Sequence, residues 1–271
     1  MMLLGIISDQ RARHSLSPRM HGAVLQRHGL EGVYLPLAVA PDDLGPALAG
    51  LAALGFRGVN VTAPYKQAVI PWLAGLGDQA RRAGAVNTIV IRDGRLEGRN
   101  TDVEGFARAL AGAGDFGPGD RALVLGAGGA ARAVVAALGG MGLRATTAAR
   151  NLERARALAH DLGGEAAWLD DIPGLAPEAD LLVNAASVSA PEEAPELAEL
   201  AGGLRLGKCR LVVDVNYGRS RNIWADLARA HGLAFMDGLP MLAQQARLSF
   251  RLWTGIDAPA EEFAAPLEES P

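Results

Sequence analysis

Short apolar runs alternate along the chain with longer segments in which apolar side chains recur at helical spacing. Short runs bounded by turn residues are typical of buried strands, and the longer periodic segments are typical of amphipathic helices. The pattern therefore predicts alternating strands and helices, the order found in α/β folds with a largely parallel sheet. The expected strands are residues 3–8, 33–37, 57–61, 86–91, 95–98, 121–125 and 144–149, and the expected helices are residues 18–28, 41–54, 102–113 and 132–140.

Turn and cap residues support several of these boundaries. Asp93-Gly94 between two strands is typical of a hairpin turn. Asp42 and Asp43 are expected to open one helix, and Asp102 to lie at or near the cap of another. A stretch rich in glycine and proline, residues 114–120, separates the two halves of the chain.

Composition narrows the class of protein. At 271 residues the chain can form one large or two moderate domains. Its net charge of -4 provides no basic field for nucleic acid, and no apolar run approaches the ~20 residues of a membrane span. The single cysteine excludes an internal disulfide and a cysteine-cluster metal site, and it fits a reducing cytoplasm. We expect a cytoplasmic enzyme without a metal, and the sequence leaves monomer and homodimer open.

Lysine is rare in this chain, which has two lysines, Lys66 and Lys208, among 26 Lys and Arg residues. A lysine amine can be tuned by its surroundings to pass protons, whereas an arginine stays protonated. Lys66 is expected in the loop that follows a strand, where open α/β sheets bind ligands. The polar run Asn100-Thr101-Asp102 follows further along the chain. We therefore predict that Lys66 and Asp102 form a proton-transfer pair, with Asp102 setting the charge state and orientation of the amine.

A nucleotide fingerprint begins the second half of the chain. The strand 121–125 runs directly into Gly126-Ala127-Gly128-Gly129-Ala130-Ala131, and a helix follows. This matches the G-x-G-x-x-A pattern in the strand, turn and helix setting that it requires. The first glycine permits the tight turn, and the second lets backbone amides approach a pyrophosphate at the amino end of the helix. We predict a dinucleotide site made by residues 126–130.

The residues after the next strand indicate which dinucleotide binds. An NAD site usually places Asp or Glu about twenty residues beyond the glycines, to accept from the ribose 2′-hydroxyl. This chain has Ala149-Arg150-Asn151 there, with Arg154 one turn further on. Guanidinium groups without a carboxylate suit a 2′-phosphate, which they can grip bidentately. The pattern favours NADP over NAD, and the competing interpretation is that both arginines lie on a solvated helix start.

Read together, these strings resemble the shikimate dehydrogenase family over nearly the whole chain. The residues Ser15-Leu16-Ser17-Pro18-Arg19-Met20-His21 resemble its substrate-carboxylate motif, and Asn60-Val61-Thr62-Ala63-Pro64-Tyr65-Lys66 resembles its catalytic-lysine motif. Residues 84–88 and 100–102 resemble two further substrate loops, and residues 238–246 resemble the helix that returns to cover the substrate.

The resemblance implies reversible, NADPH-dependent reduction of 3-dehydroshikimate to shikimate in aromatic amino acid biosynthesis. It implies two α/β domains with a cleft between them: a substrate domain of residues 1–102 plus 239–271, and a Rossmann-type NADP-binding domain of residues 103–238. Lys66 and Asp102 would be catalytic. Besides these two, the substrate-binding residues would be Ser15, Ser17, Asn60, Thr62, Asn87, Tyr217 and Gln245. The cofactor-binding residues would be Gly126, Ala127, Gly128, Gly129, Ala130, Arg150, Asn151, Arg154 and Gly238.

The chain departs from the family pattern mainly in its second half. Where the family commonly shows Asn-Ala-Thr-Ser-x-Gly-Met, residues 184–190 read Asn-Ala-Ala-Ser-Val-Ser-Ala, in a loop expected near the nicotinamide. After Tyr217, residues 218–222 replace the usual proline and threonine. Two alternatives stay open: a quinate or quinate/shikimate dehydrogenase, possibly linked to NAD, and a non-catalytic metabolite or nucleotide sensor on the same fold. Retention of Lys66 and Asp102 argues against the sensor, which has no use for a proton-transfer pair.

Overall fold

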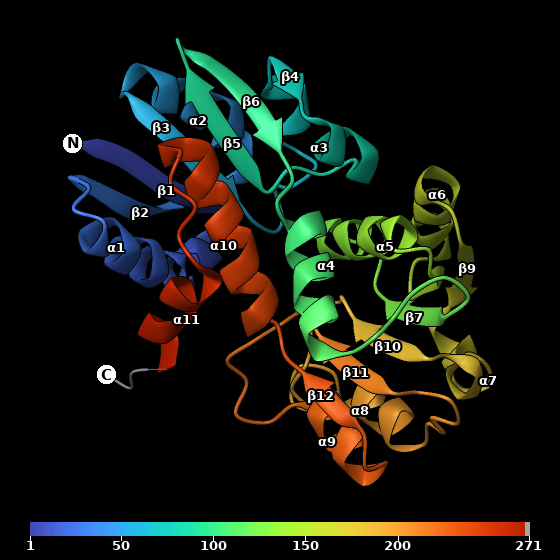
Figure 1. Cartoon of the computed structure of the whole chain (residues 1–271). Helices are drawn as coiled ribbons and strands as arrows, with labels where there is room; N and C mark the ends of the chain where they lie inside the picture. Colours follow the sequence, from blue (N-terminus) through green and yellow to red (C-terminus); the bar gives the residue numbers. More distant parts are fainter. Residues whose placement is uncertain (269–271) are drawn as a thin grey trace. The chain divides into compact units, whose positions relative to one another are not determined.

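The computed structural model describes residues 1–268 and divides the chain into two compact units (Figure 1). The first unit comprises Met1–Gly105 and Leu242–Pro271, and the second comprises Phe106–Met241. Residues 269–271 of the expected substrate domain lie outside the described residues. Each unit boundary lies three residues beyond the expected one, inside the helices α4 (Asp102–Ala113) and α10 (Leu239–Thr254). A helix that continues through the boundary leaves no turn residue in the sequence to mark it.

The first unit contains a six-stranded sheet in the order β2-β1-β3-β5-β6-β4. Strand β1 pairs in parallel with β2 and β3, whereas β5 pairs antiparallel with β3 and β6. The strands are β1 (Met2–Ser8), β2 (Gly32–Ala38), β3 (Phe56–Val61), β4 (Gly75–Leu76), β5 (Thr88–Arg92) and β6 (Arg95–Arg99).

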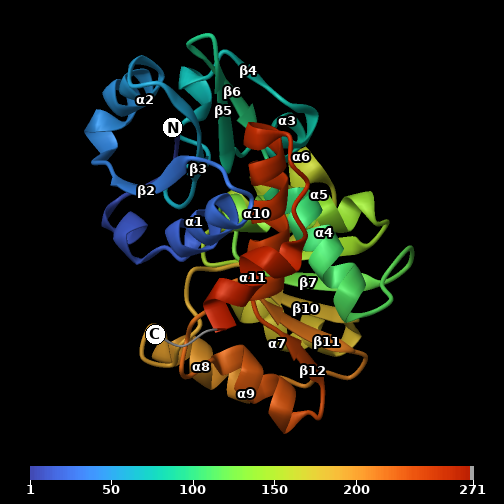
Figure 2. The ribbon, with the colours of Figure 1, turned by 60° about the vertical axis from the view of Figure 1, so that its left-hand side comes forward.

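Helices cover both faces of this sheet and make two separate apolar cores. One core joins β1 to α1 (Ser17–Arg27), α10 and α11 (Ala260–Glu268), which lie together on one face (Figure 2). The other core joins β1 and β3 to α2 (Leu44–Ala53) and α3 (Asp78–Ala83). The expected helix 41–54 is two elements, because the 3-10 turn η2 (Pro41–Asp43) precedes α2. Two further 3-10 turns are η1 (Gln10–His14) and η3 (Ile70–Trp72).

The predicted hairpin joins β5 to β6. Asp93 has φ 50° and Gly94 has φ 72°, so both turn residues adopt the left-handed conformation. Two consecutive positive φ angles are the requirement of a type I′ turn, whose twist matches that of the flanking strands. The Asp-Gly dipeptide therefore sets the register of this hairpin.

The second unit contains a six-stranded sheet in which every pair is parallel, in the order β12-β11-β10-β7-β8-β9. The order reverses between β7 and β10, which is the point where doubly wound sheets bind dinucleotides. The strands are β7 (Arg121–Leu125), β8 (Arg144–Ala149), β9 (Glu165–Trp168), β10 (Leu181–Asn184), β11 (Leu211–Asp214) and β12 (Ala234–Met236).

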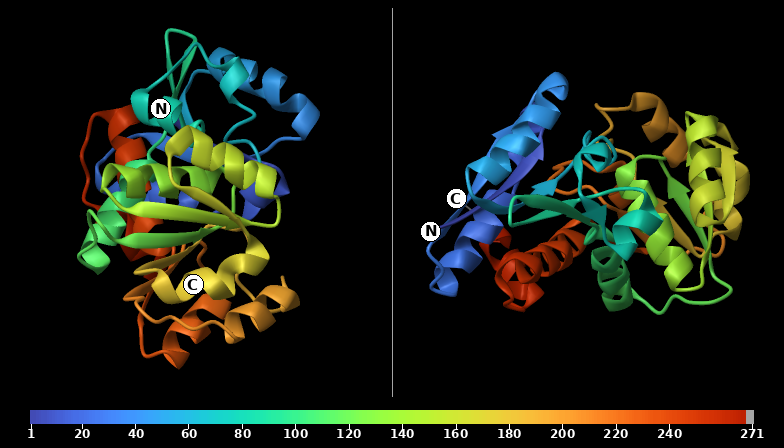
Figure 3. Two further views of the ribbon diagram at one scale, coloured as in Figure 1. Left: turned by 90° about the vertical axis from the view of Figure 1, so that its right-hand side faces the viewer. Right: turned by 90° about the horizontal axis from the view of Figure 1, so that it is seen from above.

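Helices α5 (Gly129–Gly140) and α6 (Leu152–Leu162) cover one face of this second sheet, and α8 (Pro195–Gly202) and α9 (Ile223–Ala230) cover the other (Figure 3). The remaining segments are α7 (Ile172–Leu175) and the 3-10 turns η4 (Leu169–Asp171) and η5 (Ala176–Glu178). The helix expected at residues 132–140 begins three residues earlier, so Gly129 lies in its first turn. Among the described residues, no helix combines the length and hydropathy needed to span a membrane.

Candidate active site

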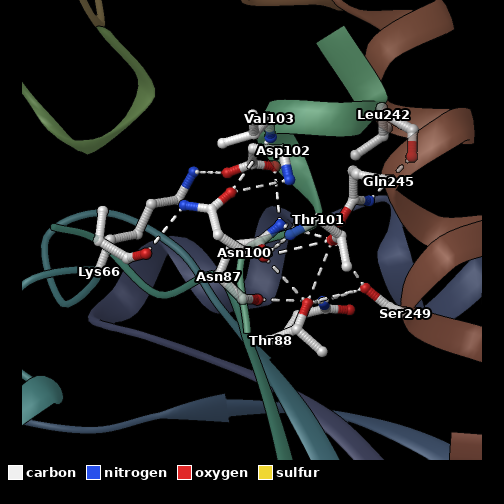
Figure 4. Close-up of polar contacts among 12 residues, drawn as sticks. Lys66, Asn87, Thr88, Asn100, Thr101, Asp102, Val103, Leu242, Gln245 and Ser249 are labelled. Atoms are coloured by element: carbon white, nitrogen blue, oxygen red, sulfur yellow. Dashed lines mark hydrogen bonds and ion pairs between the residues drawn. The ribbon is translucent and has the colours of Figure 1, made fainter. Parts of the chain in front are cut away.

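The two predicted proton-transfer residues are in direct contact in the first unit (Figure 4). Lys66 lies in the loop after β3, and its Nζ donates to Oδ2 of Asp102 at 2.7 Å. The two side chains are 15% and 7% exposed, so water screens this ion pair only partly. Val86 N donates to the backbone oxygen of Lys66 at 2.7 Å, which ties the loop to the residues before β5. An ammonium group is thus held beside a carboxylate and retains a narrow opening to solvent.

Asn100 determines where Asp102 lies. Its Oδ1 accepts from the backbone N–H of Asp102 at 3.0 Å and of Val103 at 3.2 Å, so Asn100 provides the side-chain cap of α4. Asp102 lies near the cap, as expected, and is the first residue of the helix. The Asp102 carboxylate instead accepts from Lys66 and, through Oδ1, from Asn87 Nδ2 at 2.8 Å. Both of its oxygens face the polar cluster.

Buried amides and hydroxyls from three separate segments surround the pair (Figure 4). Asn87 Oδ1 accepts from the backbone N–H of Thr101 at 2.7 Å, and its Nδ2 donates to Oγ1 of Thr101 at 2.9 Å. Oγ1 of Thr88 lies 2.8 Å from Oγ of Ser249, which belongs to α10. This network connects β5, the start of α4 and α10, and so fixes the side chains that present polar atoms to a ligand.

Asn60 lies beneath this network and is only 4% exposed. Its Oδ1 accepts from Tyr34 at 2.7 Å, and its Nδ2 reaches Thr88 Oγ1 and Ser249 Oγ, both at 3.0 Å, and Asn87 O at 3.1 Å. All its polar atoms are occupied by protein groups. In this structure Asn60 holds neighbouring groups of the site by hydrogen bonds and leaves no polar atom for a ligand.

Gln245 joins the cluster from α10. Its Oε1 lies 3.4 Å from Nδ2 of Asn87, and its Nε2 donates to the Leu242 carbonyl at 2.8 Å. A Cβ at Gly105 would come within 3.0 Å of the Gln245 backbone, so α4 and α10 approach closely here. Sequence reasoning missed Ser249, although it lies four residues after Gln245 on the same helix and therefore on the same face.

The remaining substrate residues predicted in this unit are placed separately from the Lys66 pair. Ser15 Oγ accepts from Ser17 N at 3.2 Å. Ser17 is the first residue of α1, one residue before the expected start of that helix, and is 3% exposed. Thr62 is partly buried, and its backbone N–H donates to Ile7 O at 3.1 Å. Within residues 1–268, no hydrogen bond joins Ser15, Ser17 or Thr62 to Lys66 or Asp102.

In the second unit, the glycine fingerprint forms the turn between β7 and α5. Gly126 has φ 105°, and a Cβ there would lie 2.9 Å from Ala186 N, so only glycine fits the close approach to the loop after β10. Gly128 is the N-cap of α5 and brings no side chain to the first amides of the helix. Those amides are available to an anion at the positive end of the helix. Ala127, Gly129 and Ala130 complete this turn.

The arginines predicted for the 2′-phosphate lie next to the carboxyl end of β8. Arg150 and Arg154 are exposed, and within residues 1–268 no salt bridge engages either guanidinium. Asn151 caps α6, because its Oδ1 accepts from Arg154 N at 3.0 Å. Arg150, Asn151 and the backbone N–H of Arg154 therefore lie together at the start of α6.

Tyr217 and Gly238 follow the carboxyl ends of β11 and β12. A Cβ at Gly238 would lie 2.2 Å from Val215 O, so the two segments are in close contact. Asp214 at the end of β11 is fully buried and accepts from three asparagine side chains, those of Asn184, Asn216 and Asn222. A cavity of about 430 Å³ opens here, lined by Tyr217, Gly218, Arg219, Ser220, Arg221, Asn222, Ala225, Asp226, Arg229, Phe235 and Asp237. It does not include Lys66 or Asp102.

Comparison with known proteins agrees with this geometry. Residues 7–89 match the family model described as the shikimate dehydrogenase substrate binding domain, residues 114–237 match shikimate / quinate 5-dehydrogenase, and residues 238–265 match the shikimate 5′-dehydrogenase C-terminal domain. A shikimate dehydrogenase (NADP(+)) from Acidiphilium cryptum strain JF-5 is 43% identical over 258 residues, covering 94% of this chain and 91% of that protein.

Two crystal structures extend the likeness to the fold. Shikimate dehydrogenase from Aquifex aeolicus is 33% identical with a TM-score of 0.92, covering 99% of this chain and 98% of that one. The enzyme from Thermus thermophilus, solved in complex with NADP(H) and shikimate, is 39% identical with a TM-score of 0.86, covering 98% of each chain. The chain belongs to the shikimate dehydrogenase family.

Proposed function

We propose that this protein catalyses the reversible, NADPH-dependent reduction of 3-dehydroshikimate to shikimate. The observation that carries the proposal is the contact between Lys66 and Asp102 at 2.7 Å, inside a cluster of buried amides and hydroxyls. A ketone reduction needs a proton donor at the carbonyl oxygen, and a polyhydroxylated ring acid needs many hydrogen-bond partners. Family membership and the glycine turn after β7 supply the dinucleotide half of the proposal.

The reduction balances with one hydride and one proton. NADPH held at the glycine turn after β7 would supply the hydride to the carbonyl carbon of the substrate, leaving the negative charge on the carbonyl oxygen. The ammonium of Lys66 stabilises the developing alkoxide and donates the proton that completes the hydroxyl. The Asp102 carboxylate keeps the lysine ammonium oriented, and Lys66 regains its proton through its exposed side.

The substrate-binding roles are proposed for the polar side chains that match the substrate motifs of the family. Ser15 and Ser17 would donate to the ring carboxylate. Thr62, Asn87, Asp102 and Gln245 would serve the ring hydroxyls, with Asn87 and Gln245 giving up their contact of 3.4 Å. Tyr217 stays a proposed substrate-binding residue. Asn60 would act through its neighbours, because its own donors and acceptor are occupied.

NADP rather than NAD is the proposed cofactor. Arg150 and Arg154 would grip the 2′-phosphate, and the Asn151 cap holds the segment that carries them. The amides at the start of α5 would bind the pyrophosphate, with Gly126, Ala127, Gly128, Gly129 and Ala130 allowing its close approach. Gly238 would let the chain pass close to the other half of the cofactor.

Steady-state oxidation of shikimate and of quinate, each with NADP⁺ and with NAD⁺, tests the proposal. The expected result is the largest kcat/KM for shikimate with NADP⁺. A larger value for quinate, or for NAD⁺, would reassign the substrate or the cofactor while leaving dehydrogenation intact. Binding of both ligands without turnover in any of the four assays would favour the sensor interpretation and overturn the proposed reaction.

A further inference from the structure

Two loops at the carboxyl edge of the second sheet lie where the hydride-carrying half of a dinucleotide belongs. The strand order reverses between β7 and β10, and the adenosine half is assigned to the β8 side by Arg150. The other half must then extend over the ends of β10 and β11. The loop after β10 contains residues 185–194, and the loop after β11 contains residues 215–222.

The carboxylate of Glu193 contacts both of these loops. Its Oε2 accepts from the backbone N–H of Ser189 at 2.8 Å and of Ala190 at 3.1 Å. Its Oε1 lies 2.9 Å from Nη2 of Arg219, in the other loop. The Glu193 side chain is 33% exposed, and these partners lower its pKa, with the Ser189 N–H as the largest cause. Glu193 thus caps its own loop and pairs with the neighbouring one.

The loop after β10 contacts the glycine turn between β7 and α5 directly. Ala186, in the same loop, lies so close to Gly126 that a Cβ there would be 2.9 Å from its nitrogen. Ile223 N donates to Ser189 O at 2.8 Å, which ties the loop to the start of α9. Ser189 itself is fully buried, and within the described residues its Oγ has no hydrogen-bond partner. A shift of this loop would therefore move atoms that contact the first glycine of the fingerprint.

The adjacent residue supplies a natural comparison. Glu192 pairs with Arg221 of the same neighbouring loop, with side chains 59% and 65% exposed. Within the described residues it accepts from no backbone N–H group. Exposed ion pairs contribute little to stability, because water screens both charges. Glu192 and Glu193 carry the same charge and pair with the same loop. They differ in that the Glu193 carboxylate also accepts hydrogen bonds from backbone N–H groups.

We propose that Glu193 is a positioning residue for the nicotinamide half of the cofactor site, acting by fixing the loops after β10 and β11. This inference rests on the proposed function. It requires that loss of Glu193 impairs hydride transfer and leaves binding of the adenosine half intact. The altered sequences at 184–190 and 217–222 are then linked, because Arg219 in the second is paired with Glu193, which follows the first and accepts from its Ser189 and Ala190.

Kinetics of full-length Glu193→Ala, Glu193→Gln and the control Glu192→Gln test this role. Each variant is assayed for shikimate oxidation, with adenosine 2′,5′-bisphosphate as a competitive probe of the adenosine half. Glu193→Ala should lower kcat/KM for NADP⁺ by roughly tenfold or more, because small misplacements of reacting groups are costly. Its inhibition constant for the probe should stay within about twofold. Glu193→Gln should fall between, since its amide oxygen still accepts, and Glu192→Gln should match the wild type.

Three outcomes would overturn the inference: wild-type kinetics in Glu193→Ala, an equal loss in Glu192→Gln, or a parallel loss of affinity for the adenosine probe. Melting temperatures show whether each variant is folded. Should the wild-type chain bind NADPH without oxidising shikimate, the proposed function fails on its own. NADPH fluorescence enhancement then decides the inference, since Glu193→Ala must reduce it and Glu192→Gln must not.

Discussion

At the scale of single residues, the chain concentrates its chemistry in side chains that are buried and shared. The Asp102 carboxylate accepts from both Lys66 and Asn87, and Asn87 is in turn held by Thr101. Buried charges are retained where they are paired and hydrogen-bonded, so removing one partner leaves the other charge buried without a partner. A substitution here should therefore affect the reaction step more than the affinity for ligands.

Lys66→Ala should lower kcat by about 10²–10⁴-fold, the range of general acid–base catalysis. The dissociation constant of shikimate should change by less than about tenfold, because the interaction is gained mainly in the transition state. Asp102→Asn should impair kcat comparably, since the lysine loses its charged partner. Lys66→Arg should not restore activity, because a guanidinium does not release its proton. Steady-state kinetics with equilibrium binding checks this, and near-normal kcat in Lys66→Ala would remove the residue from the mechanism.

His21 shows burial of a different kind, in an apolar setting. It is fully buried, and within the described residues neither ring nitrogen has a hydrogen-bond partner. Its ring stacks on Tyr34 at 4.5 Å and lies among Phe250, Trp253 and Phe263. Burial lowers the pKa of His21 from 6.5 to about 3, because an imidazolium in this apolar setting would lose its hydration.

This depressed pKa predicts acid sensitivity of the fold. Between pH 6.5 and about 3 the unfolded chain binds a proton at His21 that the folded chain does not. The contribution of neutral His21 to the free energy of unfolding is therefore complete above pH 6.5. It is lost as the pH falls toward 3, and the loss is on the order of 3–5 kcal/mol. His21→Phe should flatten the fall in free energy of unfolding between pH 7 and pH 4. Urea denaturation at several pH values measures this. His160→Gln, whose side chain is 88% exposed, is the control and should retain the wild-type slope.

At the scale of elements, the hydrophobic pattern predicted β1, β2, β3, β5 and β6 of the first sheet and β7 and β8 of the second, and turn chemistry predicted the hairpin. No strand was predicted for β9, β10, β11 or β12. The pattern did not predict which side chain caps a helix when two neighbouring residues could do so. Asp102 and Asn100 both suit a cap, and only the folded chain shows that Asn100 takes it. The two-residue strand β4 has no periodicity that a sequence could reveal. Ser249 was missed because its role depends on partners distant in sequence, Asn60 and Thr88.

The Asn100 cap connects an element to the chemistry. Asn100→Ala should lower the free energy of unfolding by ~1–3 kcal/mol, since two amides lose their acceptor and the buried Ala85 carbonyl loses a donor. It should also lower kcat, because Asp102 begins the helix that the cap fixes. Asn100→Ser keeps a capping oxygen and should lose less of both. Denaturation and kinetics on the same samples check this. A stability loss with unchanged kcat would separate the cap from the placement of Asp102.

At the scale of the whole molecule, each unit can be assigned a ligand from its own residues. The first unit contains the Lys66 cluster, and the second contains the glycine turn with the two exposed guanidinium groups. The Lys66 motif and the glycine fingerprint each lie within one unit, whereas the motif at residues 238–246 runs from the second unit into the first. The exact unit boundaries were not predictable, because α4 and α10 run through them without a break.

Ligand-induced stabilisation makes this assignment measurable in the intact chain. A ligand that binds only the folded state adds about 2.7 kcal/mol of stability at one hundred times its dissociation constant. NADP⁺ should therefore raise the melting temperature, and at equal concentration it should do so more than NAD⁺, because the exposed Arg150 and Arg154 can bind a 2′-phosphate. Their double substitution by Ala should remove two charge-assisted contacts of ~1.5–3 kcal/mol each.

At an NADP⁺ concentration that saturates the wild type, the double variant should show almost no NADP⁺-induced shift, while its shift with NAD⁺ stays as in the wild type. Raising the salt concentration should reduce the difference between the NADP⁺-induced and NAD⁺-induced shifts of the wild type, because salt screens the two exposed arginines. Arg156→Ala on the same helix is the control, since its guanidinium is already paired with Glu153 at 2.8 Å. An equal loss for both cofactors would mean that Arg150 and Arg154 serve the fold or the pyrophosphate. A wild-type chain stabilised more by NAD⁺ would contradict the cofactor assignment itself.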